Sequence, residues 1–132
     1  MVLAGVAGVG SAFLAIAAIE LVAHAVYAPA VMPDVSTPKA MASYVDSMPL
    51  GAFLFVLAAY DAGTVVGGLV GIAIARRHAM RFAVLAGGVI LLASIVNFVL
   101  VPHPVWFVVA TLIDVPLAAW LTGLFGRAWA PA

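Results

Sequence analysis

The sequence has no cysteine and very few charged residues. Only 8% of its 132 residues are Asp, Glu, Lys or Arg, against about 25% in an ordinary soluble domain. Without cysteine there is no disulfide scaffold and no thiol-based redox site. Five basic residues balance five acidic ones, so the basic surface of a nucleic-acid-binding protein is missing as well. A soluble globule of this size needs a largely polar surface, which so few charges cannot supply.

Recognisable catalytic signatures are also missing. The sequence contains no glycine-rich nucleotide loop, no histidine box for a di-iron centre, no zinc-protease helix motif and no serine nucleophile elbow. No motif indicates a cofactor, and an enzyme is therefore the least favoured functional class.

Long apolar segments dominate the chain, in which 67% of residues are hydrophobic. A helix needs about 20 apolar residues to cross a membrane core about 30 Å thick. Four windows meet this requirement, at about 2–27, 50–75, 82–101 and 105–125. They predict an all-α, integral membrane four-helix bundle that forms one domain over residues 1–132. The first window has no basic start and exceeds the roughly 7–15 apolar residues of a signal peptide, so we expect it to be retained.

The basic residues predict how the bundle is oriented. Arg76, Arg77 and Arg81 lie between the second and third windows, and Arg127 follows the fourth, whereas Lys39 stands alone on the other side. Short cytoplasmic loops retain Lys and Arg. We therefore expect a multi-pass protein of the bacterial inner (plasma) membrane with both termini in the cytoplasm.

The outer loop and the membrane interfaces carry their own signals. Thr37 followed by Pro38 is typical of a helix start, and apolar residues then recur at helical spacing. They predict a short amphipathic helix, either a connector packed on the bundle or a lid over an outer pocket. Trp106 and Phe107 are expected at the outer interface and Trp129 at the inner one.

Acidic residues inside the apolar windows are the strongest functional signal. A charge at membrane depth costs several kcal/mol, about 2.5–3.5 on insertion scales, so each needs a partner, a proton or a water-filled cavity. Most of these polar groups fall in the outer half or near the midplane. The candidate ligand- or proton-binding residues are Glu20, His24, Asp61, Asn97, His103 and Asp114.

Glu20 and His24 lie four residues apart and therefore share one helix face. They can hold a proton between them, fix helix packing through a hydrogen bond, or bind a metal. A metal would need a further ligand from His103 or Asn97. Glu20, His24 and His103 are accordingly weak candidate metal ligands.

Asp61 and Asp114 also have two interpretations each. Asp61 can be a neutral acid hydrogen-bonded to Tyr60, to Thr64 or to a neighbouring helix. Asp114 lies two residues before Pro116, which can kink the helix and so build a gate or an ion site. It can equally be a buried acid satisfied by Thr111 and Asn97.

A ridge of small residues repeats every fourth position in the second window: Ala59, Gly63, Gly67 and Gly71. Such ridges let helix backbones approach closely in membranes. We expect this one to pack helices together and to support a homo-oligomer.

Several short motifs resemble those of small four-span bacterial membrane proteins to which no activity is assigned. They are Glu20-x-x-x-His24-x-x-Tyr27, Met48-Pro49-x-Gly51-Ala52, Gly67-Gly68, Asn97, and Pro102-His103-Pro104-x-Trp106-Phe107. The resemblance implies the same four-span topology and adds no reaction. Those proteins have small or apolar residues in place of Asp61 and Asp114. The resemblance therefore favours a family-wide role for Glu20, His24, Asn97 and His103 over one for the two aspartates.

The leading functional hypothesis is an outward-facing polar pocket that binds or transports a small solute, a cation or a proton. The alternative is an accessory subunit of a larger membrane complex. A third is an intramembrane enzyme that uses Glu20 and His24 on a lipid-soluble substrate. The expected partners are the lipid bilayer and either further copies of the chain or another membrane subunit, with no nucleic acid.

Overall fold

The computed structural model describes residues 1–130 and is helical throughout its regular structure. Four of its helices are long and apolar enough to cross a membrane, which confirms the all-α four-helix membrane bundle. Residues 131–132 of the predicted domain lie outside the described residues. The helices are α1 (Val2–Tyr27), α2 (Pro38–Ser47), α3 (Leu50–Ala75), α4 (Ala79–Leu100) and α5 (Val105–Gly126).

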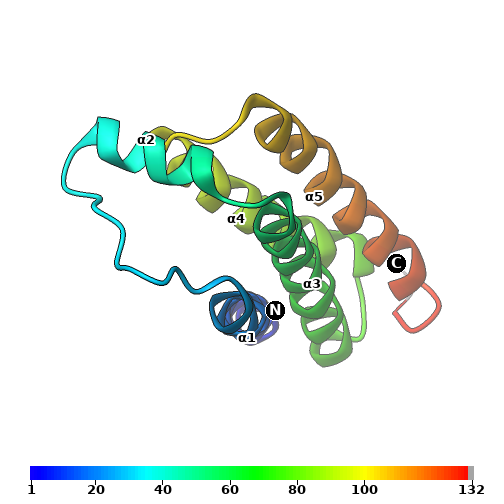
Figure 1. Ribbon diagram of the computed structural model, residues 1–132. Helices are drawn as coiled ribbons and strands as arrows, with labels where there is room; N and C mark the ends of the chain where they lie inside the picture. The colour runs from blue at the N-terminus through cyan, green and yellow to red at the C-terminus, as the bar shows by residue number, and fades with distance from the viewer. Residues whose placement is uncertain (131–132) are drawn as a thin grey trace.

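The four long helices form an open bundle with α3 and α4 in the middle (Figure 1). Each of these two contacts the other three long helices, whereas α1 and α5 do not touch each other anywhere in residues 1–130. We call the end with Arg76, Arg77 and Arg81 the arginine end, and the end with Pro102–Pro104 the hairpin end. α1 and α4 begin at the arginine end, whereas α3 and α5 begin at the hairpin end.

Glycine determines how closely α1 approaches α3. A Cβ atom built on Gly67 would lie 2.7 Å from Ala12 Cβ and 2.8 Å from the Gly8 carbonyl oxygen. One built on Gly63 would lie 2.7 Å from Ile16 Cγ1. Ala59 and the three glycines of the ridge are all buried. Within one chain, the ridge lies against α1 at Gly63 and Gly67 and against Phe82 of α4 at Gly71, so these neighbours cover the face that we expected to meet a second copy.

At the hairpin end, α2 contributes one buried side chain, Val45, to the core of the bundle. Thr37 Oγ1 accepts a hydrogen bond from the Ala40 backbone N–H at 3.1 Å, which confirms the predicted helix start. Val45 is buried in the same apolar cluster as Phe53 and Phe107.

That cluster corrects one expectation. Phe107 is fully buried, with its ring centroid 5.4 Å from that of Phe53 and 5.8 Å from that of Trp106. It therefore does not serve as an interface anchor, whereas Trp106 is 42% exposed and remains available for that role.

Candidate functional site

Polar side chains from three helices line one small cavity in the half of the bundle near the hairpin end. Its volume is about 250 Å³, and α1, α3 and α4 all contribute to its walls. The polar lining residues are Glu20, Tyr60, Ser94 and Asn97. The fold thus brings together Glu20 and Asn97, which are 77 positions apart in the sequence.

Helical periodicity explains how each residue reaches this cavity. On α1, Phe13, Ile16 and Glu20 follow the spacing of one helix face, and all three line the cavity. On α3, Tyr60 lies three residues before Gly63 and seven before Gly67, so it shares the face that packs against α1.

Tyr60 and Ser94 are polar cavity residues that were not among the sequence candidates. For Tyr60 the available signal was its register with the glycine ridge, because the ridge marks the α3 face that another helix covers. For Ser94 it was the three-residue spacing from Asn97 on the same helix. Asp61, the residue after Tyr60, lies about 100° further around α3 and lines a different groove.

The cavity offers both hydrogen-bonding groups and one acid. Ser94 Oγ donates to the Ile90 carbonyl at 2.8 Å and so keeps its own lone pairs as acceptors. The Tyr60 hydroxyl lies beside the side chains of Ser94 and Asn97. Tyr60 is only 8% exposed, whereas Glu20 is an exposed residue at the rim. A polar interior with a carboxylate at its mouth suits a small solute that donates hydrogen bonds or carries positive charge.

His24 lies outside this cavity. Its Nδ1 donates to the main-chain carbonyl of Glu20 at 3.1 Å, and the imidazole is exposed. The interaction between these two residues is thus with the backbone of Glu20, and the carboxylate itself remains at the cavity.

His103 belongs to the aromatic cluster at the hairpin. Its Nδ1 donates to the Val101 carbonyl at 2.7 Å. The ring stacks on Phe107 at 5.5 Å with an interplanar angle of 16°, and it meets Phe98 edge-on at 5.1 Å. In residues 1–130 no three His, Asp or Glu side chains gather as metal ligands, so Glu20, His24 and His103 are not brought together.

Asp61 and Asp114 are neighbours in a separate groove of about 640 Å³ between α3 and α5. Apart from Thr122, the rest of that lining is apolar or aromatic, with Trp129 at the arginine end. Asp61 Oδ1 is buried and has no hydrogen-bond partner. α3 separates this acid pair from the Glu20 cavity, so the six sequence candidates do not converge on one site.

Two hydroxyls that were expected to satisfy these acids bond elsewhere. Thr64 Oγ1 donates to the Tyr60 carbonyl at 2.9 Å, and Thr111 Oγ1 donates to the Phe107 carbonyl at 2.9 Å. Each is an i to i−4 bond within its own helix, which is the usual way for a threonine to satisfy its hydroxyl in a membrane helix.

Comparison of the sequence with protein-family models, with curated proteins and with solved structures finds no match. We therefore base the proposed function on the residues that line the cavities.

Proposed function

We propose that this multi-pass membrane protein binds a small cationic solute in the cavity lined by Glu20, Tyr60, Ser94 and Asn97. The observation that carries the proposal is the convergence of these four polar side chains, from three helices, on one space of about 250 Å³. Ser94 Oγ already donates to the Ile90 carbonyl, so a ligand would meet the remaining lone pairs of this hydroxyl, the Tyr60 hydroxyl, the Asn97 amide and the Glu20 carboxylate.

The charge and size of the cavity favour a small cation. Glu20 is its only ionisable carboxylate, and Phe13 and Tyr60 add aromatic rings, which attract cations through their faces. A volume of about 250 Å³ lies below the roughly 300–1,000 Å³ of pockets for drug-sized ligands. The ligand class is therefore an ammonium-sized ion or a proton carried by water, rather than a large metabolite.

Retention of arginine on the cytoplasmic side supports an outward-facing cavity. Arg76, Arg77 and Arg81 gather at the arginine end, and the cavity lies in the opposite half. In a bacterial inner membrane this arrangement opens the Glu20 cavity toward the periplasm and leaves both described ends of the chain in the cytoplasm.

Reconstitution into liposomes tests the assignment of Glu20. The purified protein is adsorbed on a solid-supported membrane, and currents are recorded after jumps of ethylammonium chloride or of pH. We expect a binding current that falls at least about tenfold in Glu20→Gln, because the neutral amide loses the charge-assisted contact of about 1.5–3 kcal/mol. Asp46→Asn removes an exposed acid outside the cavity and should leave the current unchanged.

Each outcome has a defined meaning. An ethylammonium current that survives Glu20→Gln contradicts the role of this carboxylate. A response to pH jumps alone, lost in Glu20→Gln, replaces the organic cation with a proton. Silence of the wild-type protein to both jumps contradicts the cation class altogether.

One observation favours the accessory subunit as a second candidate. Between the Glu20 cavity and the arginine end, the seam between α1 and α4 is lined by apolar residues such as Val9, Phe82 and Leu85. The polar lining of the Glu20 cavity therefore does not continue along this seam, and a transport path along it would need groups from further copies or from a partner subunit. Stoichiometric co-purification of another membrane protein in mild detergent would favour this candidate over a solute-binding protein.

A further inference from the structure

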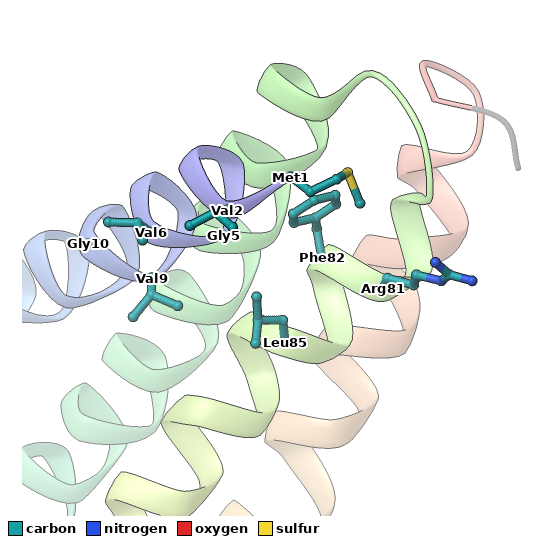
Figure 2. A pocket seen from close by; sticks show the side chains of 9 residues that line it. All are labelled: Met1, Val2, Gly5, Val6, Val9, Gly10, Arg81, Phe82 and Leu85. Carbon is teal, nitrogen blue, oxygen red and sulfur yellow. The ribbon is translucent and has the colours of Figure 1, made fainter.

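A second, larger space is an open surface groove between α1 and α4 at the arginine end, and its chemistry is different. It measures about 840 Å³ and is almost entirely apolar. Figure 2 shows the first turns of α1 on one side and the start of α4 on the other. Its main lining residues are Gly5, Val9, Gly10, Phe82 and Leu85, with Arg81 at the rim. We call this space the α1–α4 groove.

Two features of the sequence keep the groove open. Gly8 packs so tightly on α3 that a Cβ there would lie 2.7 Å from the Gly67 carbonyl oxygen, which holds α1 against α3 rather than α4. Gly10 faces empty space, because a Cβ atom built on it meets no heavy atom within 4 Å. The groove is thus a consequence of close α1–α3 packing combined with a missing side chain.

The rim of the groove carries one arginine, and two more lie in the preceding turn. The guanidinium of Arg81 extends outward from α4 at the rim (Figure 2), and Arg76 and Arg77 lie in the turn just before that helix. Glu20, Asp61 and Asp114 belong to other parts of the bundle. Among the described residues, an apolar slot with Arg81 at its rim matches a molecule with a hydrocarbon chain and an anionic head.

We propose that the α1–α4 groove is a binding site for an anionic phospholipid. One acyl chain lies along Gly5, Val9 and Gly10, and the phosphate group meets Arg81 at the rim. Basic pockets between membrane helices bind anionic headgroups in this way, and guanidinium groups pair well with phosphate. The volume is within the roughly 300–1,000 Å³ of ligand pockets.

Charge favours an anionic lipid over a second copy of the chain as the occupant of the groove. A parallel copy docked on the groove would bring its own arginines to the same end, where like charges repel. A phosphate group instead brings the opposite charge to Arg81. This site is also independent of the Glu20 cavity, since it lies at the other end of the α1–α4 seam and uses none of the same residues.

The headgroup arm of the test compares two lipids with identical acyl chains. Delipidated protein in detergent is titrated with phosphatidylglycerol or phosphatidylcholine, and the bound lipid is counted by native mass spectrometry. We expect preferential binding of phosphatidylglycerol, and about a fivefold loss of that preference in Arg81→Gln. Arg127→Gln removes an arginine that follows α5 and does not line the groove, and it should keep the preference.

The acyl-chain arm fills the groove without touching the existing packing. Gly10→Leu places a side chain in the open space and should weaken the binding of both lipids. Ala18→Leu enlarges an exposed residue of α1 that is not part of the groove lining, and it should change neither. Circular dichroism melting of each variant confirms that it is folded before its lipid binding is compared.

Three results would overturn the proposal. They are equal binding of the two lipids by the wild-type protein, unchanged binding in both Arg81→Gln and Gly10→Leu, and a lipid-free dimer that Gly10→Leu dissociates. The last result would show that a second copy occupies the groove. None of these measurements depends on the ethylammonium response of the Glu20 cavity, so the two proposals fail separately.

Discussion

Gly67 lacks a side chain, and this absence sets the distance between α1 and α3. The backbones meet where larger residues would force the helices apart, with Gly8 and Ala12 facing Gly67. Because no hydrophobic effect drives helices together in lipid, such close packing carries much of the association energy. One added methyl group at this contact is therefore enough to weaken the packing of α1 on α3.

Adding one methyl group at this contact should destabilise the fold. Gly67→Ala places Cβ 2.7 Å from Ala12 Cβ and 2.8 Å from the Gly8 carbonyl oxygen, and we expect a loss of about 1–3 kcal/mol in the free energy of unfolding. Gly10→Ala adds the same methyl group to open space on α1 and should cost nothing. Unfolding by sodium dodecyl sulfate in mixed micelles, followed by circular dichroism, measures both. Equal stability of the two variants would contradict the contact.

Asp34 provides a pH-dependent contact outside the membrane helices. Its Oδ1 accepts hydrogen bonds from the Ser36 hydroxyl at 2.6 Å and from the Ser36 backbone N–H at 2.9 Å. The hydroxyl bond, followed by the backbone bond, lowers the pKa of the Asp34 carboxyl below its ordinary value. A depressed folded-state pKa means that the turn is fully stabilised above the ordinary Asp pKa and loses this contribution as the pH falls through the lowered value.

Nuclear magnetic resonance can follow this titration. The Ser36 amide proton should shift with a midpoint below the ordinary Asp pKa, because it donates to the titrating carboxylate. In Ser36→Ala the hydroxyl bond is lost, and the Asp34 midpoint should rise toward the ordinary value. A midpoint that does not respond to this substitution would show that the hydroxyl bond is absent in solution.

At the scale of elements, the turn between α3 and α4 is unusual. Arg76 ends α3 with φ 53° and ψ 27°, and His78 precedes α4 with φ 56° and ψ 46°. This left-handed region favours glycine, since a Cβ atom there costs about 1–2 kcal/mol. The chain keeps two charged or ionisable side chains where glycine would relieve strain, which fits a role for positive charge at the arginine end.

Replacing the helix-ending arginine should therefore stabilise the protein. Arg76→Gly removes a Cβ atom from a left-handed position, and we expect the free energy of unfolding to rise by about 1 kcal/mol. Arg77 has no positive φ, so Arg77→Gly should lower stability or leave it unchanged, because glycine has more backbone entropy to lose. Unfolding of the two variants in detergent micelles, measured under the same conditions, compares their free energies of unfolding. Similar destabilisation of both would contradict the strain.

At the scale of the whole molecule, the open bundle creates two kinds of space. α1 and α5 never meet in residues 1–130, so grooves remain on both sides of the central α3–α4 pair. The polar side chains are distributed unevenly among them, with the Glu20 cavity toward one end and the apolar α1–α4 groove toward the other. The molecule is therefore polarised along the membrane normal, and its function depends on which end faces outward.

The orientation can be tested because the chain has no cysteine of its own. Ser43→Cys on α2 and Ala128→Cys after α5 each introduce one thiol at an exposed position. In intact cells a membrane-impermeant maleimide should label Ser43→Cys, and Ala128→Cys only after the membrane is permeabilised. The reverse labelling would place the Glu20 cavity toward the cytoplasm. Leu92→Cys, on the exposed apolar face of α4, should react in neither case.

Much of the fold followed from the chain alone. The bounds of α1 and α3 agree with the predicted windows, because their lengths match a bilayer and a proline or a run of arginines stops each one. α4 begins three residues earlier than the window at 82, since hydropathy does not detect the left-handed His78 that starts it. Helix start signals were sufficient for α2, where Thr37 and Pro38 act through purely local chemistry.

Only part of the candidate site could be predicted from the sequence. Local periodicity placed Glu20 on a helix face and placed Asn97 near the same depth, and the fold brings both to one cavity. Neither the separation of Asp61 and Asp114 from that cavity nor the stacking of the half-buried His103 on aromatic rings could be predicted from spacing. Both depend on which faces of α3 and α5 meet.

The sequence by itself determined that the protein resides in a membrane, that four helices cross it, and where charge is concentrated. These properties depend on composition and on periods within one helix, which need no knowledge of neighbours. Only the tertiary structure decided which helix covers the glycine ridge, that Tyr60 completes the polar cavity, and that an apolar groove opens beside Arg81. Helices that are apolar on every side can pack in several ways, so the pairing follows from side-chain fit between helices rather than from a polar and an apolar face.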